Sequence, residues 1–186
     1  NTYNELESPE FQVAQALSGP MSGLENQGWT LVFADYKGPY HAYGAGKLSG
    51  QATLDAIRAA LAFEPLGLSA DTPVGMWGYS GGALASTWAA SLQPKYAPEI
   101  NLVAVAAGGT AVDVFGVTKY TENTSNFGLL FTLLVGLNRA YPELFPEGLL
   151  NAEGLRIAEA SKDGCHGATT DGSASASGRL ADFTTV

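Results

Sequence analysis

Basic residues are scarce in this chain of 186 residues. Nine Lys and Arg stand against eighteen Asp and Glu, and the formal net charge at pH 7 is −9. Nucleic acids and anionic membrane surfaces are bound through basic patches, because each cationic side chain neutralises a phosphate. The acidic balance argues against both, and the sequence predicts no nucleic-acid partner.

Cysteine and histidine are nearly absent, and long hydrophobic runs are missing. Cys165 has no second cysteine in the chain for a disulfide, and His41 and His166 lie far apart. Nothing has the spacing of a metal site, so we expect no metal and no cofactor. No apolar stretch approaches the roughly 20 residues of a membrane helix, which predicts no integral membrane segment.

What the sequence does contain is typical of a folded α/β domain: 46% of its residues are hydrophobic and only 15% are charged. Three short apolar runs predict strands at residues 31–34, 74–78 and 102–107. Two stretches between them predict helices at 49–62 and 83–92, the second closed by Pro94. Strands and helices in alternation predict a parallel sheet covered on both faces.

The pattern changes after residue 109. Residues 127–137 are strongly apolar, residues 152–160 predict a short helix, and residues 172–178 predict an exposed low-complexity loop. The predicted organisation is an α/β core in residues 1–112 followed by a helical region and loop in residues 113–186.

The most informative motif is Gly78-Tyr79-Ser80-Gly81-Gly82, which matches Gly-x-Ser-x-Gly. A nucleophilic serine on a tight strand-to-helix turn needs a strained backbone, and the residues two before and two after it crowd each other. Both should therefore be very small. The N–H of Gly81 is expected to be an oxyanion donor. The alternative is an ordinary glycine-rich turn, but the flanking strand and helix favour a nucleophilic Ser80.

The segment Gly44–Gly50 has a weaker likeness to nucleotide-binding motifs. Its third glycine is one place late for Gly-x-Gly-x-x-Gly, and His41 and Leu48 replace the Gly and the Ser or Thr of a P-loop. We interpret it as a flexible turn before a helix. A dinucleotide-binding domain is the alternative.

The base and acid of a triad are less clear than the nucleophile. In α/β-hydrolases the triad residues follow the chain order Ser, then Asp or Glu, then His. His41 precedes Ser80, so it does not fit the base, and the remaining role for it is to line the site. His166 has the required order, and Asp113 is the acid that would accompany it. Because His166 follows a region poor in strands, we interpret it as a loop residue rather than the base.

Several segments together resemble the secretory lipase family of fungi and actinobacteria, over roughly residues 27–112 and again at 149–154. The segments that carry the similarity are Gln27-Gly28-Trp29, residues 35–39, 46–59 and 78–83, Trp88-Ala89-Ala90-Ser91-Leu92, residues 96–101, and Gly108-Gly109-Thr110. The resemblance implies an α/β-hydrolase fold with Ser80 as the nucleophile and Gly81 as an oxyanion donor. It also implies a helical lid after Asp113.

Six apolar residues of that lid fit a surface for acyl chains, although a plain core helix would show the same pattern: Phe127, Leu129, Leu130, Phe131, Leu133 and Leu134. Family members are expected to be much longer than this chain. The resemblance places their second oxyanion donor before Asn1, their triad acid and base after Val186, and a partner for Cys165 downstream. We therefore expect a middle segment of a longer enzyme, with the rest of that enzyme as its partner.

The predicted function is that of a serine carboxylic-ester hydrolase, a secreted triacylglycerol lipase that acts on a lipid or ester substrate at an interface. The alternatives are a non-catalytic hydrolase-like protein, or another serine hydrolase such as a cutinase, feruloyl esterase or peptidase. The sequon Asn123-Thr124-Ser125 is consistent with a secreted glycoprotein.

Overall fold

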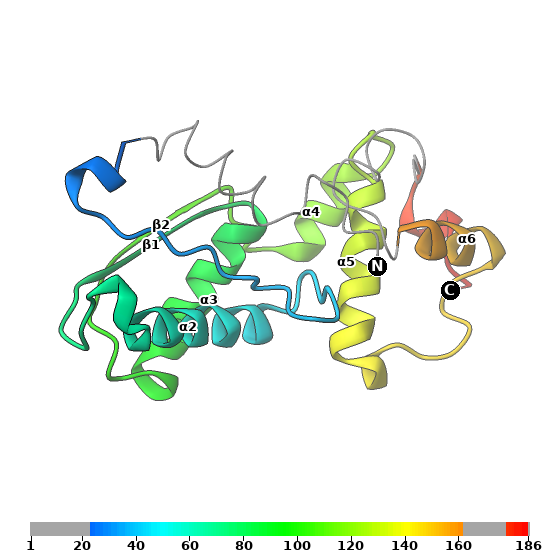
Figure 1. Ribbon diagram of the computed structural model, residues 1–186. Helices are drawn as coiled ribbons and strands as arrows, with labels where there is room; N and C mark the ends of the chain where they lie inside the picture. The colour runs from blue at the N-terminus through cyan, green and yellow to red at the C-terminus, as the bar shows by residue number, and fades with distance from the viewer. Residues whose placement is uncertain (1–22, 162–177, 186) are drawn as a thin grey trace.

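Two parallel strands, β1 (Val74–Tyr79) and β2 (Leu102–Gly108), form the sheet. The computed structural model describes residues 23–161 and 178–185 (Figure 1). The register runs from Val74 opposite Leu102 to Tyr79 opposite Gly108, with one irregularity after Val74. The strands predicted at 74–78 and 102–107 are thus confirmed.

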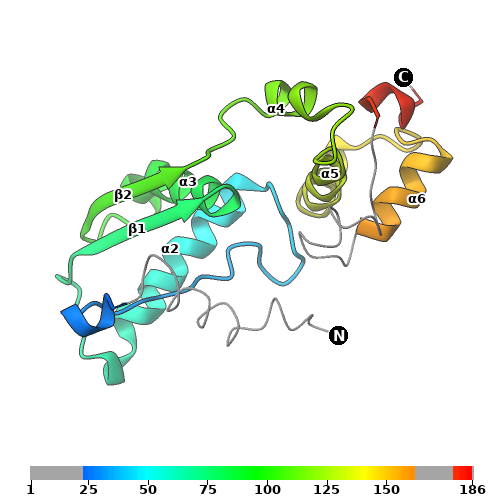
Figure 2. The same ribbon diagram turned by 90° about the horizontal axis from the view of Figure 1, so that it is seen from above.

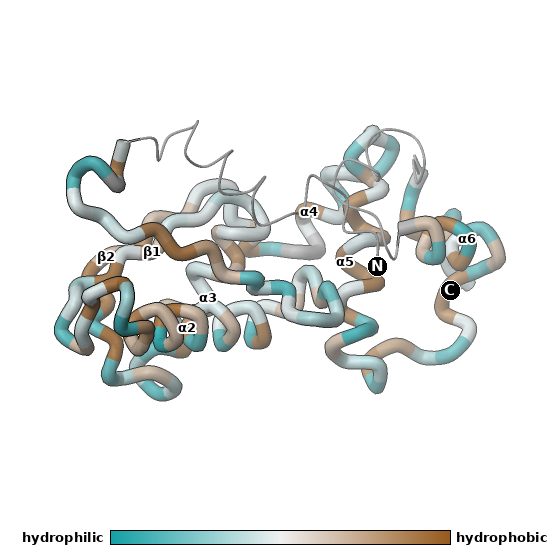
Figure 3. Tube along the Cα trace, viewed as in Figure 1, coloured by the Kyte–Doolittle hydropathy of each residue, from teal (hydrophilic) through white to brown (hydrophobic). Residues whose placement is uncertain are grey.

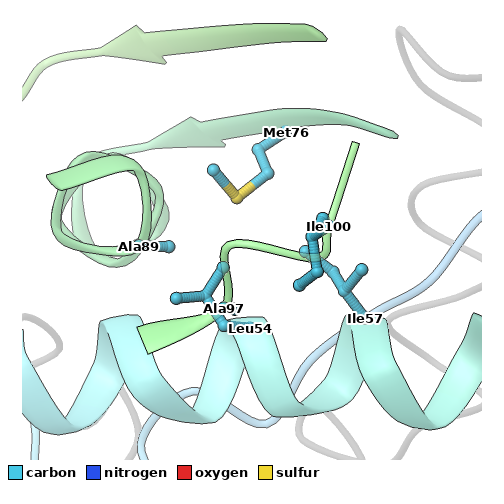
Figure 4. Packing of buried hydrophobic residues seen from close by; sticks show 6 residues of the cluster. All are labelled: Leu54, Ile57, Met76, Ala89, Ala97 and Ile100. Carbon is cyan, nitrogen blue, oxygen red and sulfur yellow. The ribbon is translucent and has the colours of Figure 1, made fainter. Parts of the chain in front are cut away.

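Helices α2 (Gly46–Ala62) and α3 (Gly81–Tyr96) both cover the same face of this sheet. Figure 4 shows Met76 of β1 pointing from the sheet toward α2, with Ala89 of α3 beside it. These side chains belong to one buried cluster that is formed by α2, β1, α3 and the turn after α3. Its members are Leu54, Ile57, Met76, Ala89, Ala97 and Ile100. The cluster packs β1 against the middle of α3, and the serine motif joins these two elements.

Glycines allow α2 and α3 to approach closely. A β-carbon on Gly50 would lie 2.8 Å from the backbone nitrogen of Ala89, and one on Gly46 would collide with the Trp88 ring. The segment interpreted as a flexible turn is therefore the first turn of α2, which begins three residues before the predicted start. These glycines serve helix packing, which leaves the dinucleotide-binding alternative without a phosphate loop.

The opposite face of the sheet is exposed, so the prediction of helices on both faces is wrong for the described residues. Trp77 is 50% exposed, Tyr79 73% and Val103 62%. Among the described elements, α3 connects β1 to β2 and α2 precedes β1, and both helices pack on the same face. The apolar residues of the strands predicted that both faces of the sheet are buried. Composition does not identify which element covers each face.

Residues 31–34 do not form a strand, contrary to the prediction. They pass β1 on the side away from β2 without pairing to either strand (Figure 2). Figure 3 shows this hydrophobic stretch beside β1, and Val32 and Phe33 are exposed. The hydropathy of residues 31–34 is typical of a buried strand, but a strand also requires backbone hydrogen bonds to a neighbouring strand.

Helix α3 extends past Pro94, which was predicted to close it. Pro94 lies in the last turn, and the helix continues to Tyr96, where the N–H of Ala97 donates to the carbonyl of Gln93. A proline has no N–H to donate to the carbonyl four residues before it, so α3 continues past Pro94 with that one hydrogen bond missing. The helix also starts two residues earlier than expected, directly after Ser80.

A network centred on Arg58 joins α2 to the end of α3. The Arg58 guanidinium donates to Glu99 at 2.5 Å, to Asp55 at 2.9 Å and to the carbonyl of Tyr96 at 2.6 Å. The Tyr96 hydroxyl in turn donates to Asp55. Arg58 holds the pKa of the Glu99 carboxyl below its usual range.

The second half of the chain forms a separate helical cluster at the other end of the molecule (Figures 1 and 2). It contains α4 (Val114–Thr121), α5 (Gly128–Ala140) and α6 (Ala152–Ser161). Its buried residues are Phe127, Leu130, Phe131, Ile157 and Phe183. The helix expected at 152–160 is confirmed, and the division into domains at residue 112 remains a prediction.

Short 3₁₀ turns complete the described elements: η2 (Glu25–Gln27), η3 (Glu64–Leu66), η4 (Pro142–Leu144) and η5 (Leu180–Asp182). Across the two described ranges, every helix is too short or too polar to cross a bilayer. The same residues contain no group of three or more His, Cys, Asp or Glu side chains arranged to hold a metal ion.

Candidate active site

Ser80 occupies the sharp reversal between β1 and α3, and its backbone is strained. Its φ is 52° and its ψ is −114°, a conformation that residues with side chains rarely adopt. Two backbone hydrogen bonds hold it: the Ser80 N–H donates to the Gly108 carbonyl at 2.9 Å, and its carbonyl accepts from Leu84 N–H at 3.0 Å. Ser80 is exposed. The motif is thus a strand-to-helix elbow that presents its serine to solvent.

The glycine two places before Ser80 is required by close approach, and the one two places after it is not. A β-carbon on Gly78 would collide with the backbone of Gly82 and lie 2.7 Å from the nitrogen of Ala83. On Gly82, a β-carbon would meet no described atom within 4 Å. The expectation that both positions need glycine is therefore confirmed for Gly78 alone. A side chain at the strand position Gly78 would collide with the backbone of α3, whereas one at Gly82 would not collide with the strand.

Two tyrosines from the turn before α2 lie against Gly81. A β-carbon on Gly81 would be 2.8 Å from the Tyr36 hydroxyl and 2.9 Å from Cε2 of Tyr43. The Tyr43 hydroxyl is farther away, at 3.7 Å. Burial raises the pKa of Tyr36 to about 12, with smaller contributions from Tyr43 and Asp35. The residue after the serine is thus bordered by a neutral phenol.

Tyr79 covers the loop that follows β2. Its ring would lie 3.0 Å from a β-carbon on Gly108 and 3.1 Å from one on Gly109, whose φ is 61°. The two glycines allow the loop to pass under this ring while the Gly108 carbonyl accepts the Ser80 N–H. The end of β2 therefore holds the elbow through this hydrogen bond.

One family model, described as secretory lipase, matches residues 11–171, which is most of the chain. The chain belongs to this family. The strained serine at the elbow between strand and helix is the feature that the Gly-x-Ser-x-Gly motif predicted, now with its geometry.

Relatives of known name share much of the sequence. Lipase 1 of Candida albicans is 46% identical over 135 residues, which are 71% of this chain and 28% of that protein. A secreted triacylglycerol lipase of Malassezia furfur is 40% identical over 143 residues, covering 76% of this chain and 31% of the relative. The chain thus spans about a third of the length of the curated relatives it matches.

The fold comparison gives the same family. The X-ray structure of Candida antarctica lipase A matches with a TM-score of 0.73 and 32% sequence identity, over 82% of this chain and 35% of that one. The predicted α/β-hydrolase class is confirmed, with a parallel sheet and helices that represent part of such a domain.

The structure gives none of the other triad candidates a contact that identifies it as the base or the acid. Asp113 caps the N-terminus of α4, and its carboxylate accepts from the Gly116 N–H at 3.0 Å. His41 lies in the turn before α2, with a φ of 49°. His166 and Cys165 fall outside the described residues. We therefore assign no base or acid from geometry.

The six apolar residues predicted for acyl binding lie mostly in or against the core of the helical cluster. Phe127, Leu130 and Phe131 are buried in the helical cluster, so these three are core residues. Leu133 packs against these residues and also reaches the turn before α2, where it fills the space that a side chain at Gly44 would need. Leu133 and Leu134 also pack against that cluster, so five of the six residues support the alternative of a plain core helix.

Sequence reasoning missed Tyr36 and Tyr43. Both follow the segment 31–34 in a Gly-rich turn, and no local pattern links them to a motif almost forty residues later. Their approach to Gly81 depends on how α2 packs on α3, which is a tertiary property.

Proposed function

We propose that this protein is a secreted serine carboxylic-ester hydrolase whose nucleophile is Ser80. The observation that carries the proposal is the strained, exposed backbone at Ser80 between β1 and α3. Strain of this kind costs about 1–3 kcal/mol and persists where the surrounding structure enforces it, which is typical of active sites. Gly78 and the two hydrogen bonds of Ser80 are the enforcing features.

In the proposed reaction, the Ser80 oxygen attacks the carbonyl carbon of the ester. Its proton passes to a general base, which we do not assign, and the carbonyl oxygen becomes an oxyanion that accepts a hydrogen bond from the Gly81 N–H. Collapse expels the alcohol and leaves an acyl-enzyme on Ser80. Water then attacks the acyl group and releases the carboxylic acid.

We propose triacylglycerol as the substrate class, because the Malassezia furfur relative bears that name. Secretion is proposed on the same ground, since the family is named for secretory lipases. The catalytic unit would combine this chain with further polypeptide of the same enzyme, which is consistent with the fraction of each relative that the chain covers.

We further propose that Asn123 carries an N-linked glycan. It lies exposed in the turn between α4 and α5, with a φ of 59° that turns the chain sharply, and Ser125 supplies the hydroxyl of the sequon. The Asn123 N–H donates to the Gly178 carbonyl, so the turn is held by its backbone.

Covalent labelling tests the nucleophile. The protein, expressed from its complete gene, is treated with a fluorophosphonate probe, and the labelled peptide is sequenced by mass spectrometry. We expect one label, on Ser80, and loss of both label and ester hydrolysis in Ser80→Ala. Hydrolysis that survives in Ser80→Ala would refute the proposal, and an unlabelled, inactive wild type would favour a non-catalytic hydrolase-like protein.

A panel of p-nitrophenyl esters of increasing acyl length, together with an emulsified triacylglycerol, tests the substrate class. A lipase is expected to turn over the emulsion and the long-chain esters. Activity confined to short esters, to feruloyl esters or to peptides would move the protein to another class of serine hydrolase.

A further inference from the structure

We propose that the Tyr36 hydroxyl donates a hydrogen bond to the oxyanion, beside the Gly81 N–H. The proposal rests on the proposed function, because it needs Ser80 to be the nucleophile. It adds a second catalytic group within this chain, one that the Gly-x-Ser-x-Gly motif does not contain.

Position is the first argument. The Tyr36 oxygen is the described atom that comes nearest to a β-carbon placed on Gly81, at 2.8 Å. Tyr43 approaches the same point with its ring edge at 2.9 Å, and its hydroxyl is 3.7 Å away. Of these two tyrosines, Tyr36 presents its polar end to the residue that follows the nucleophile, and Tyr43 presents carbon.

The second argument is the state of the phenol. Within residues 23–161 and 178–185, no hydrogen bond of the Tyr36 hydroxyl is recorded, so its proton is available to a ligand. Burial raises the pKa of Tyr36 to about 12, which keeps the group protonated throughout the range in which ester hydrolases work. A neutral phenol donates to an anion, whereas a phenolate would repel it.

The third argument is chemical demand. When Ser80 attacks, the carbonyl oxygen gains a full negative charge and accepts more than one hydrogen bond. Donors fixed in place before reaction stabilise this charge without reorganisation, and they act most strongly in a water-poor site. The half-buried Tyr36 hydroxyl has that character.

A purely mechanical role is the competing explanation. The two rings would then act as a wedge that keeps Gly81 in position, and the Tyr36 hydroxyl would be incidental. Replacing each tyrosine by phenylalanine separates the explanations, because both variants keep the ring and remove only the oxygen. Tyr43→Phe is the matched control, since its hydroxyl lies farther from Gly81.

The experiment measures kcat and KM on a p-nitrophenyl ester for the wild type, Tyr36→Phe and Tyr43→Phe, expressed from the complete gene. Rates are divided by the concentration of sites that a fluorophosphonate labels, so misfolded protein does not count. We expect kcat of Tyr36→Phe to fall by about 10-fold or more with KM nearly unchanged, since removal of one oxyanion donor lowers kcat by roughly 10²–10³ in a known case. Tyr43→Phe is expected to lose clearly less kcat than Tyr36→Phe, because its hydroxyl lies farther from Gly81.

A second readout is inhibition by an alkyl trifluoromethyl ketone, whose adduct with Ser80 carries an oxyanion. Its inhibition constant should rise in Tyr36→Phe by the factor that kcat/KM falls. Equal losses in both variants, an unchanged kcat, a change in KM alone, or failure of Tyr36→Phe to label would each overturn the proposal. Turnover that persists in Ser80→Ala would instead refute the proposed function.

Discussion

At the scale of single residues, the elbow combines one unfavourable conformation with several close approaches that enforce it. Ser80 takes a positive φ, Gly78 leaves room for the backbone of Gly82, and Tyr79 lies over Gly108 and Gly109. The sequence motif predicted the strain and the need for Gly78. It did not predict the tyrosines or the freedom at Gly82, because both depend on the path of the chain outside the motif.

Replacement of Gly78 by alanine should destabilise the protein, because the added carbon collides with the backbone of Gly82. We expect a loss of about 1–3 kcal/mol in the free energy of unfolding, as in other overpacked sites. Labelling of Ser80 should fall with it. Thermal denaturation and fluorophosphonate labelling measure the two effects.

Gly75→Ala is the control on the same strand. No described atom lies within 4 Å of its added carbon, and its φ is not positive. Stability should be unchanged or rise by up to about 1 kcal/mol, because alanine restricts the unfolded chain. A Gly75→Ala variant as damaged as Gly78→Ala would show that crowding at the elbow is not the cause.

The sequon gives a second prediction at this scale. Secreted from a yeast host, the wild type should lose mass on treatment with a peptide N-glycosidase, and Asn123→Gln and Ser125→Ala should not. Thr124→Ala keeps the sequon and serves as the control. A wild type of unmodified mass would contradict the proposed glycan.

At the scale of elements, composition predicted which segments are helices and strands better than it predicted their neighbours. Strands β1 and β2 and helices α2, α3 and α6 lie where their patterns predicted. Residues 31–34 have the same pattern and are unpaired, and Pro94 did not end α3 where expected. Pairing and helix length are decided by contacts between distant residues, which local patterns do not encode.

The Arg58 network predicts a pH dependence for the contact between α2 and the end of α3. Arg58 lowers the pKa of Glu99 from the ordinary value of 4.5, so the ion pair stabilises the fold fully above pH 4.5. The contribution is lost as the pH falls through the lowered pKa. Glu99→Gln should therefore melt below the wild type at pH 7, and the two should converge once the pH falls below the lowered pKa of Glu99.

Thermal melts at several pH values check this expectation, with Glu147→Gln as an exposed control. Both partners of the Arg58 pair are partly solvated, so the difference at pH 7 should be small. A gap between the Glu99→Gln and wild-type melting temperatures that widens toward low pH would contradict the assignment.

At the scale of the whole molecule, the two hydrophobic clusters meet through the turn before α2. Gly136 of α5 lies directly on the backbone of Tyr43, and the Tyr43 ring contacts the Gly81 site. Arg139 of α5 also donates to the carbonyl of Tyr40 at 3.2 Å. The helical region is thus in physical contact with the elbow through one residue.

Gly136→Ala should disturb both ends of this contact. The added carbon would lie 2.8 Å from the Tyr43 carbonyl carbon, so α5 or the turn must shift. We expect a loss of about 1–3 kcal/mol in stability and slower labelling of Ser80 in the folded protein. Asn138→Ala, at an exposed position of α5, should change stability by less than about 0.5 kcal/mol. Unchanged labelling in folded Gly136→Ala would separate the helical cluster from the site.

The bare side of the β1–β2 sheet has a practical consequence for work in solution. The side chains of Trp77 and Tyr79 are exposed on this face. The outer edges of β1 and β2 have no partner among the described strands. Exposed apolar faces and unpaired strand edges promote association between copies of a chain. Sedimentation of this polypeptide on its own should accelerate as the sample is concentrated, and dilution should reverse it.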